Sequence, residues 1–97
     1  MTTQANIVSF EWDQGNSDKN YKKHGVTTAE AEEVFLDSNL TILEDTKHSQ
    51  QERRFFAMGK TLKDKLLVVI YTHRESNARI ISARIANKKE HLIYEKT

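Results

Sequence analysis

Acid–base side chains and arginines gather in the second half of the chain, close to the ends of predicted strands. They are His48, Glu52, Arg54, Arg74 and Arg84. A guanidinium group beside apolar residues needs an anionic partner, which can be a carboxylate of the protein or the phosphate of a ligand. A histidine or a carboxylate nearby can accept or donate a proton. The residue types therefore predict an anion-binding site with acid–base groups at its edge.

Ion pairs between neighbouring strands are the alternative interpretation of the same residues. Glu52 could pair with Arg54 or Arg84 and join two strands, which contributes roughly a few tenths of a kcal/mol for an exposed pair. Structural ion pairs are more common than catalytic ones. In the same way, His24 just before Gly25 is more often a helix C-terminal residue that interacts with the helix dipole than a catalyst. The residue types alone thus indicate a small domain with a candidate anion site.

Several other chemistries are excluded. The chain has no cysteine, which rules out disulfides, a thiolate nucleophile and a cysteine zinc site. Its three glycines are isolated, so there is no glycine-rich phosphate loop. The four histidines show no metal-ligand spacing, and Ser49 directly beside His48 cannot form a catalytic triad. We therefore expect neither a metal nor a cofactor.

Length and composition predict one domain, residues 1–97. A chain of this size buries roughly 60–65% of the surface that its unfolded form exposes, which is enough for a single core. Charged residues make up 30% of the sequence, but the apolar residues stand in blocks, which argues against disorder. The polar segment Met1–Asn6 does not resemble a signal peptide, and no apolar run approaches the length of a membrane span. We expect a cytoplasmic protein without membrane contact.

The charge is unevenly distributed although its net value is only +1. Acidic residues predominate from Thr28 to Asp45, whereas arginines and lysines cluster after Glu52. A basic face of this kind suits contact with phosphates, but from charge alone an ordinary solvated surface is the favoured interpretation.

The first half of the chain predicts one strand and two helices. The weakly alternating segment Ile7–Trp12 is typical of a short strand. A polar helix over Ser17–His24 would end at Gly25, which suits the C-terminal cap. A second helix over Thr28–Leu36 begins with a capping box at Thr27 and presents apolar residues at helical spacing.

The second half predicts four strands and a last helix. The strands are Leu40–Glu44, Arg53–Met58, Leu66–Tyr71 and Ala78–Ala86, and a helix follows from Asn87 to about Glu95. The turns between the last three strands are short, so neighbours should be antiparallel. We therefore expect an α+β fold with a short N-terminal strand, two helices, a mostly antiparallel four-stranded meander and a C-terminal helix.

Strict alternation along the last strand predicts which of its side chains share a face. Ile80, Ser82 and Arg84 should lie on one side. The other side should carry Arg79, Ile81, Ala83 and Ile85. Arg79 and Arg84 are thus expected on opposite faces.

Several segments, in order and at similar spacing, resemble the BrnT toxin family, which is related to the RelE-type ribonucleases. The resemblance runs from about Phe10 to Tyr94. Its segments are Phe10-Glu11-Trp12-Asp13, Asn20, Lys23-His24-Gly25-Val26, Glu30-Ala31, Val34-Phe35-x-Asp37, His48-Ser49-x-x-Glu52-x-Arg54-Phe55, Gly59, Leu67-Val68-Val69-x-Tyr71-Thr72-x-Arg74, Arg79-Ile80-Ile81-Ser82-Ala83-Arg84-x-Ala86, Lys89-Glu90 and Tyr94.

The resemblance implies a RelE-like ribonuclease fold, cleavage of RNA without a metal, and a BrnA-like antitoxin that binds the toxin. DNA contact would then occur only through the antitoxin, which represses the shared operon. The implied catalytic residues are His48, Glu52, Arg54, Arg74 and Arg84. The residues expected to contact RNA are Lys23, His24, Arg79, Lys89 and Tyr94.

Metal-free RNA cleavage suits these residue types. The ribose 2′-hydroxyl attacks the adjacent phosphate, so the reaction needs a base, an acid and cations for the charge that develops on the phosphorane. Glu52 or His48 would be the base. Arg54, Arg74 and Arg84 would clamp the phosphate, and the remaining histidine or Tyr94 would assist the leaving group.

The chain departs from the family pattern at a few positions. Asn16-Ser17 stands where the family usually has Lys-Ala, Ile85 where it has lysine, and Asn87 where it has threonine. The missing lysine favours a second hypothesis, a BrnT-like binding module that has lost cleavage and only pairs with a DNA-binding antitoxin. A third is an α+β interaction domain whose arginines are structural.

Overall fold

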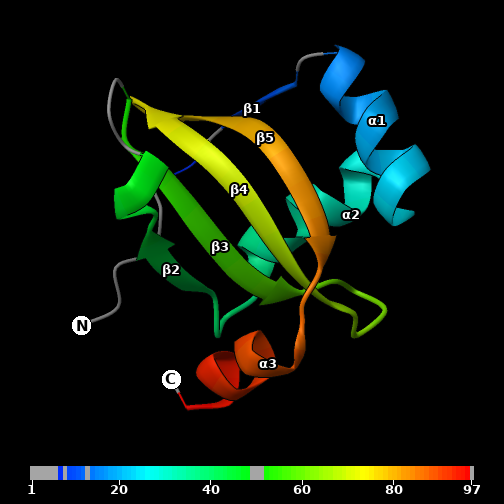
Figure 1. Cartoon of the computed structure of the whole chain (residues 1–97), viewed down its shortest axis with the longest axis vertical. Coiled ribbons are helices and arrows are strands. Elements are labelled where there is room, and N and C mark those ends of the chain that lie inside the picture. The colour runs from blue at the N-terminus through cyan, green and yellow to red at the C-terminus, as the bar shows by residue number, and fades with distance from the viewer. Residues whose placement is uncertain (1–6, 8, 13, 49–51, 97) are drawn as a thin grey trace.

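The computed structural model describes residues 7, 9–12, 14–48 and 52–96. Three helices, two 3-10 helices and five strands occupy these ranges (Figure 1). In chain order they are β1 (Ser9–Trp12), α1 (Gln14–His24), α2 (Thr28–Glu33), η1 (Val34–Leu36), β2 (Thr41–Glu44), η2 (Thr46–His48), β3 (Arg54–Lys60), β4 (Leu66–Arg74), β5 (Asn77–Ile85) and α3 (Lys88–Glu95). The expected α+β class and order of elements are confirmed.

The strands form one mixed sheet in the order β1-β5-β4-β3-β2. Strands β2 to β5 are an antiparallel meander, as expected from the short turns. The first strand lies parallel to β5 at the edge of the sheet, with Glu11 opposite Arg79. This pairing brings the two ends of the chain into one sheet, which no local pattern predicts.

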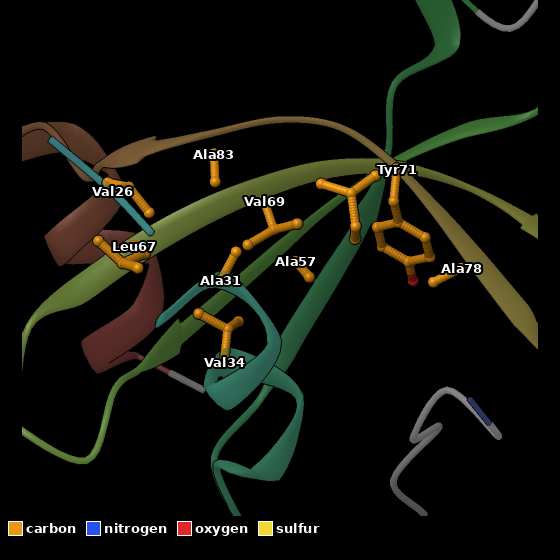
Figure 2. Packing of buried hydrophobic residues seen from close by; sticks show 10 residues of the cluster. Val26, Ala31, Val34, Ala57, Leu67, Val69, Tyr71, Ala78 and Ala83 are labelled. Carbon is orange, nitrogen blue, oxygen red and sulfur yellow. The ribbon is translucent and has the colours of Figure 1, made fainter. Parts of the chain in front are cut away.

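One face of the sheet packs against α2 and η1. Ala31 and Val34 from these helices contact Ala57 and Val69 of the central strands in a fully buried cluster (Figure 2). A Cβ built on Gly59 would lie 2.7 Å from the carbonyl oxygen of Val34. Glycine at this position therefore allows β3 and η1 to approach closely.

The opposite face is covered by a helix only at one end. Ile93 and Tyr94 of α3 pack on Met58, Leu66 and Val68, while α2 and η1 lie on the first face and α1 lies beside the edge of β5 (Figure 1). In the described part of the chain, no helix covers the rest of this second face. We call that remainder, which carries Arg54, Thr72, Arg74 and Arg79, the open half of the sheet.

The predicted alternation along β5 is wrong, because the strand contains a β-bulge. Ile70 is opposite Ser82 and Tyr71 is opposite Ile80, so that Ile81 is the extra residue. Ile80 and Ala83 consequently both point to the first face, into the core between the sheet and the helices α2 and η1. The extra residue turns Arg79 to the same face as Arg84, which is how a bulge redirects a side chain.

Other differences concern the ends of elements. Helix α1 begins three residues earlier than expected, and the second predicted helix tightens into η1 after Glu33. Gly25 closes α1 with a φ of 68°, as its position predicted. The last strand was expected to begin at Ala78 but begins at Asn77, so that only two residues join β4 and β5. Among the described residues, no helix is long and apolar enough to cross a membrane.

Candidate active site

A row of polar side chains crosses the open half of the sheet from strand to strand. Arg54 of β3 lies opposite Thr72 of β4, Thr72 lies opposite Arg79 of β5, and Arg79 lies opposite Glu11 of β1. Directly opposite residues have Cα atoms about 4.5–5.5 Å apart. The two arginines therefore flank Thr72 on one surface.

A second row begins two residues further along β4. Arg74 lies opposite Asn77, and Asn77 lies opposite Ser9. The Asn77 amide donates a hydrogen bond to Glu11 Oε1 at 2.8 Å and accepts one from the Ser9 hydroxyl at 2.9 Å. These contacts hold the edge strand β1 to the hairpin and fix the carboxylate of Glu11 at the margin of the open half.

Glu52 approaches this surface from the segment before β3 and pairs with Arg74. Arg74 Nε donates to Glu52 Oε2, and Arg74 Nη2 donates to Glu52 Oε1 at 3.1 Å. The hydrogen bonds from Arg74 lower the pKa of Glu52, and the charge of Arg79 lowers it further. Glu52 is therefore ionised at neutral pH. The sequence-based expectation that Glu52 pairs with Arg54 or Arg84 is wrong, because its partner is Arg74.

Arg79 is an exposed cation beside this pair. In the part of the chain that the structure describes, it makes no hydrogen bond or ion pair, although its charge acts on Glu52. A guanidinium group in this state offers all its donors to an anion from solution. The open half thus combines Arg54, Arg74 and Arg79 with the carboxylates of Glu52 and Glu11.

Arg84 lies on the same face but at the other end of the sheet. It is opposite Val68, six residues from Arg74 along β4, a distance of roughly 20 Å. Its guanidinium donates two hydrogen bonds of 2.7 Å to Glu90, and Glu90 also closes the capping box at the start of α3 with Asn87. The expected clamp of three arginines that includes Arg84 does not form, because strand length separates them.

Tyr94 and Lys89 lie with Arg84 at the end of the second face that α3 covers, which we call the covered end. The Tyr94 hydroxyl donates a 2.5 Å hydrogen bond to Asp37 Oδ2. Burial and this bond raise the pKa of Tyr94 to about 12. Burial opposes ionisation of Asp37, but the hydrogen bonds that it receives from Tyr94, Asn39 and Lys60 lower its pKa below 3.8. Tyr94 thus holds α3 to the segment after η1, and Lys89 is exposed on α3.

The helix that carries the basic residues Lys23 and His24, α1, lies beside the edge of β5, beyond the end of β1. Lys23 is exposed and His24 half-buried at the end of this helix. The helix is held to β5 by Asn20, whose side-chain oxygen accepts a 3.0 Å hydrogen bond from the backbone amide of Ala83. The structure therefore does not bring Lys23 and His24 to the open half.

His48 is only partly described. Its backbone ends η2, shortly before Glu52 in the sequence. Its side chain lies outside the described residues, so its predicted role stays a prediction.

Three residues of the open half were not singled out as site residues from the sequence. They are Glu11, Thr72 and Asn77. The signal for two of them was present, because a two-residue turn at Glu75-Ser76 fixes 74 opposite 77 and 72 opposite 79. The third, Glu11, depends on the parallel edge strand.

The donor set of the open half suits an anion. Guanidinium groups present planar pairs of N–H donors that match phosphate oxygens. Among the described residues, no group of three histidine or acidic side chains is placed to hold a metal ion. The arrangement can bind a phosphodiester and accept a proton beside it.

Comparison with known proteins connects this arrangement to a family. The model of the family described as "Ribonuclease toxin, BrnT, of type II toxin-antitoxin system" matches residues 12–90. The crystal structure of the Brucella abortus ribonuclease toxin BrnT is similar in fold, with a TM-score of 0.63 and 21% sequence identity over 84% of this chain and 100% of that one. None of the curated proteins compared with the chain matches it. Because the family match spans most of the chain, the protein belongs to the BrnT family of ribonuclease toxins of type II toxin–antitoxin systems.

Proposed function

We propose that this protein is a toxin that cleaves RNA without a metal, by attack of a ribose 2′-hydroxyl on the adjacent phosphate at the open half of the sheet. One observation carries the proposal. In a chain of a ribonuclease family, three arginines and a glutamate converge on the part of the second face that α3 leaves uncovered.

Arg54 and Arg79 would bind the phosphate first. They flank the same position on β4, so both can reach one phosphodiester. Each positioned donor to the charge that develops in the transition state contributes about 2.7–4 kcal/mol. Among the described residues, Arg79 has no hydrogen-bond or ion-pair partner that it would have to release before it binds the phosphate.

Arg74 would link phosphate binding to proton transfer. Its hydrogen bonds keep the pKa of Glu52 low, which makes the carboxylate a weak base. When Arg74 turns toward a bound phosphate, Glu52 loses its main stabilising partner and its pKa rises. Glu52 then becomes a better acceptor for the proton of the 2′-hydroxyl, and His48 is the second candidate for base or acid.

Two of the departures from the family pattern, Ile85 and Asn87, lie outside the open half. Asn87 performs the capping that its position requires, since its side chain accepts from the amide of Glu90 at 2.9 Å. Ile85, where a lysine is usual, is exposed at the end of β5 opposite Leu67. The missing lysine thus removes a charge from the covered end of the sheet.

We further propose a protein antitoxin of the BrnA kind as the partner, a cytoplasmic location, and DNA contact only through that antitoxin. Membership of a toxin–antitoxin family supports this assignment. Co-expression with the neighbouring gene product should relieve the growth arrest that the toxin alone causes.

The decisive experiment uses the purified chain and an RNA oligonucleotide with EDTA present. We expect cleavage products that end in a 2′,3′-cyclic phosphate, and no cleavage where a single 2′-deoxyribose replaces the ribose at the scissile position. Glu52→Gln should slow the reaction by roughly 10²–10⁴. Intact RNA with folded wild-type protein would contradict the ribonuclease assignment and favour the binding module.

A further inference from the structure

The hydroxyl of Thr72 is buried and has no hydrogen-bond partner among the residues that the structure describes. The residue is 5% exposed, and its Oγ1 makes no hydrogen bond within the described part of the chain. Threonine hydroxyls in a sheet usually bond to a neighbouring backbone or side-chain group. An unsatisfied hydroxyl of this kind opposes folding, and valine would fill the same volume without that penalty.

The position of Thr72 suggests what the hydroxyl is for. Its cross-strand neighbours are Arg54 on one side and Arg79 on the other. Tyr71 lies in the first core cluster, so Thr72, next along the strand, points to the second face. The hydroxyl therefore lies at the centre of the cationic row, and the long side chains beside it are the groups that can cover it.

The other buried polar atoms without partners lie elsewhere. In the described residues they are Asn20 Nδ2 and His73 Nε2. Asn20 belongs to α1 at the edge of β5, and His73 alternates with Thr72 and has its ring 6.4 Å from that of Tyr71. Of these atoms, only the Thr72 hydroxyl lies on the face that carries the arginines.

We propose that Thr72 is a substrate-binding residue whose hydroxyl donates a hydrogen bond to a non-bridging oxygen of the phosphodiester held by Arg54 and Arg79. The inference rests on the proposed function, and it adds to the phosphate-binding site a neutral hydrogen-bond donor that lies between the two arginines. When the guanidinium groups lift toward the phosphate, they uncover the hydroxyl, which then gains a partner that the described residues of the free protein do not supply.

The test compares Thr72→Val and Thr72→Ser in the full chain. Thr72→Val should keep or raise the free energy of unfolding in urea, because it removes an unsatisfied hydroxyl. It should also lower kcat/KM for RNA cleavage by about 10- to 100-fold, the value of one hydrogen bond to a charged group. Thr72→Ser should retain most of the activity. Unchanged kcat and KM in Thr72→Val, or a clear loss of stability, would overturn the inference and leave the proposed function intact.

A binding measurement separates the inference from the cleavage reaction. The probe is a fully 2′-O-methylated RNA oligonucleotide, which cannot react. If the wild type binds it and Thr72→Val binds it about 10-fold more weakly, the phosphate contact stands even where no RNA is cleaved. Equal Kd values for the two proteins, or no binding by either, would overturn it.

Discussion

Two arginine–glutamate pairs lie on the same face of the sheet, and they differ in what holds the glutamate. Glu90 is part of α3 and closes its capping box, so Arg84 binds a carboxylate that the fold has already placed. Glu52 stands in the segment before β3, and Arg74 binds it at the rim of the open half. The side chains are 30% and 17% exposed in the first pair, but 50% and 37% in the second.

The difference shows that residue type alone does not separate structural from functional arginines. A pair that is partly withdrawn from water and tied to a helix terminus stabilises the packing of that helix. An exposed pair contributes little to stability, because water and salt screen it. Its arginine can exchange one anion for another at small cost, which is what a phosphate-binding site requires.

The largest expected effect tests the open half. Arg54→Ala should lower kcat/KM for RNA cleavage by roughly 10²–10³, because it removes one cation from the developing charge on the phosphorane. The matched control is Arg53→Ala, the preceding residue, which pairs with Glu44 and lies over the ring of Phe55. Kinetics on an RNA oligonucleotide should show a loss for the first variant and none for the second. Equal losses of activity in the two variants would mean that the position of Arg54 on the open half does not matter for cleavage, and that the open half is not the site.

The covered end should respond in the opposite way. Arg84→Ala leaves the Glu90 carboxylate without its bidentate partner, and we expect the free energy of unfolding to fall by about 1–2 kcal/mol. For a chain of this size the Tm should fall by roughly 5–10 °C. Thermal denaturation measures the fall in Tm. RNA cleavage is assayed well below the Tm, and there Arg84→Ala should keep the activity of the wild type. If the Arg84→Ala protein is folded but no longer cleaves RNA, Arg84 has a catalytic role and this prediction is wrong.

The pH dependence of stability should follow Glu90 as well. The hydrogen bond from Arg84 lowers the pKa of Glu90 below its ordinary value of 4.5. In the folded state Glu90 therefore binds its proton less readily than in the unfolded state, so its contribution is present above pH 4.5 and is lost as the pH falls through the lower, folded value. Urea unfolding from pH 7 to pH 3 should show that wild type and Glu90→Gln differ most at neutral pH and converge in acid. A gap that widens in acid would contradict this assignment.

The smallest effect concerns the hairpin that carries Arg74. Glu75 has a φ of 55°, which places a side chain in the left-handed region. Glu75→Gly should raise the free energy of unfolding by about 0.5–1 kcal/mol through relief of that conformation, without altering cleavage. Ser76→Gly is the control, since Ser76 is not in that region and glycine there should lower stability. Denaturant unfolding of the two variants gives the comparison, and a stability change of the same sign in both would refute it.

The sequence was informative wherever neighbours along the chain decide the outcome. The capping boxes at Thr27 and Asn87 were predicted from residue types three apart, and both are present. The short turns predicted an antiparallel meander, and the apolar blocks predicted its core. Arg54 and Arg74 lie close together because their strands, β3 and β4, are neighbours in the chain and in the sheet, and Glu52 from the segment before β3 pairs with Arg74.

Only the tertiary structure decided which charged groups meet. Arg84 was grouped with Arg54 and Arg74 through the resemblance to the family, yet β5 carries Arg84 to the far end of the sheet, where α3 supplies Glu90. The bulge at Ile81 reversed the face of Arg79, and the parallel pairing of β1 brought Glu11 beside it. Helix caps and turns depend on contacts within a few residues, so the amino-acid order determines them directly. Strand register, bulges and ion-pair partners depend on how distant segments pack, and a single extra residue in one strand is enough to change which side chains form the site.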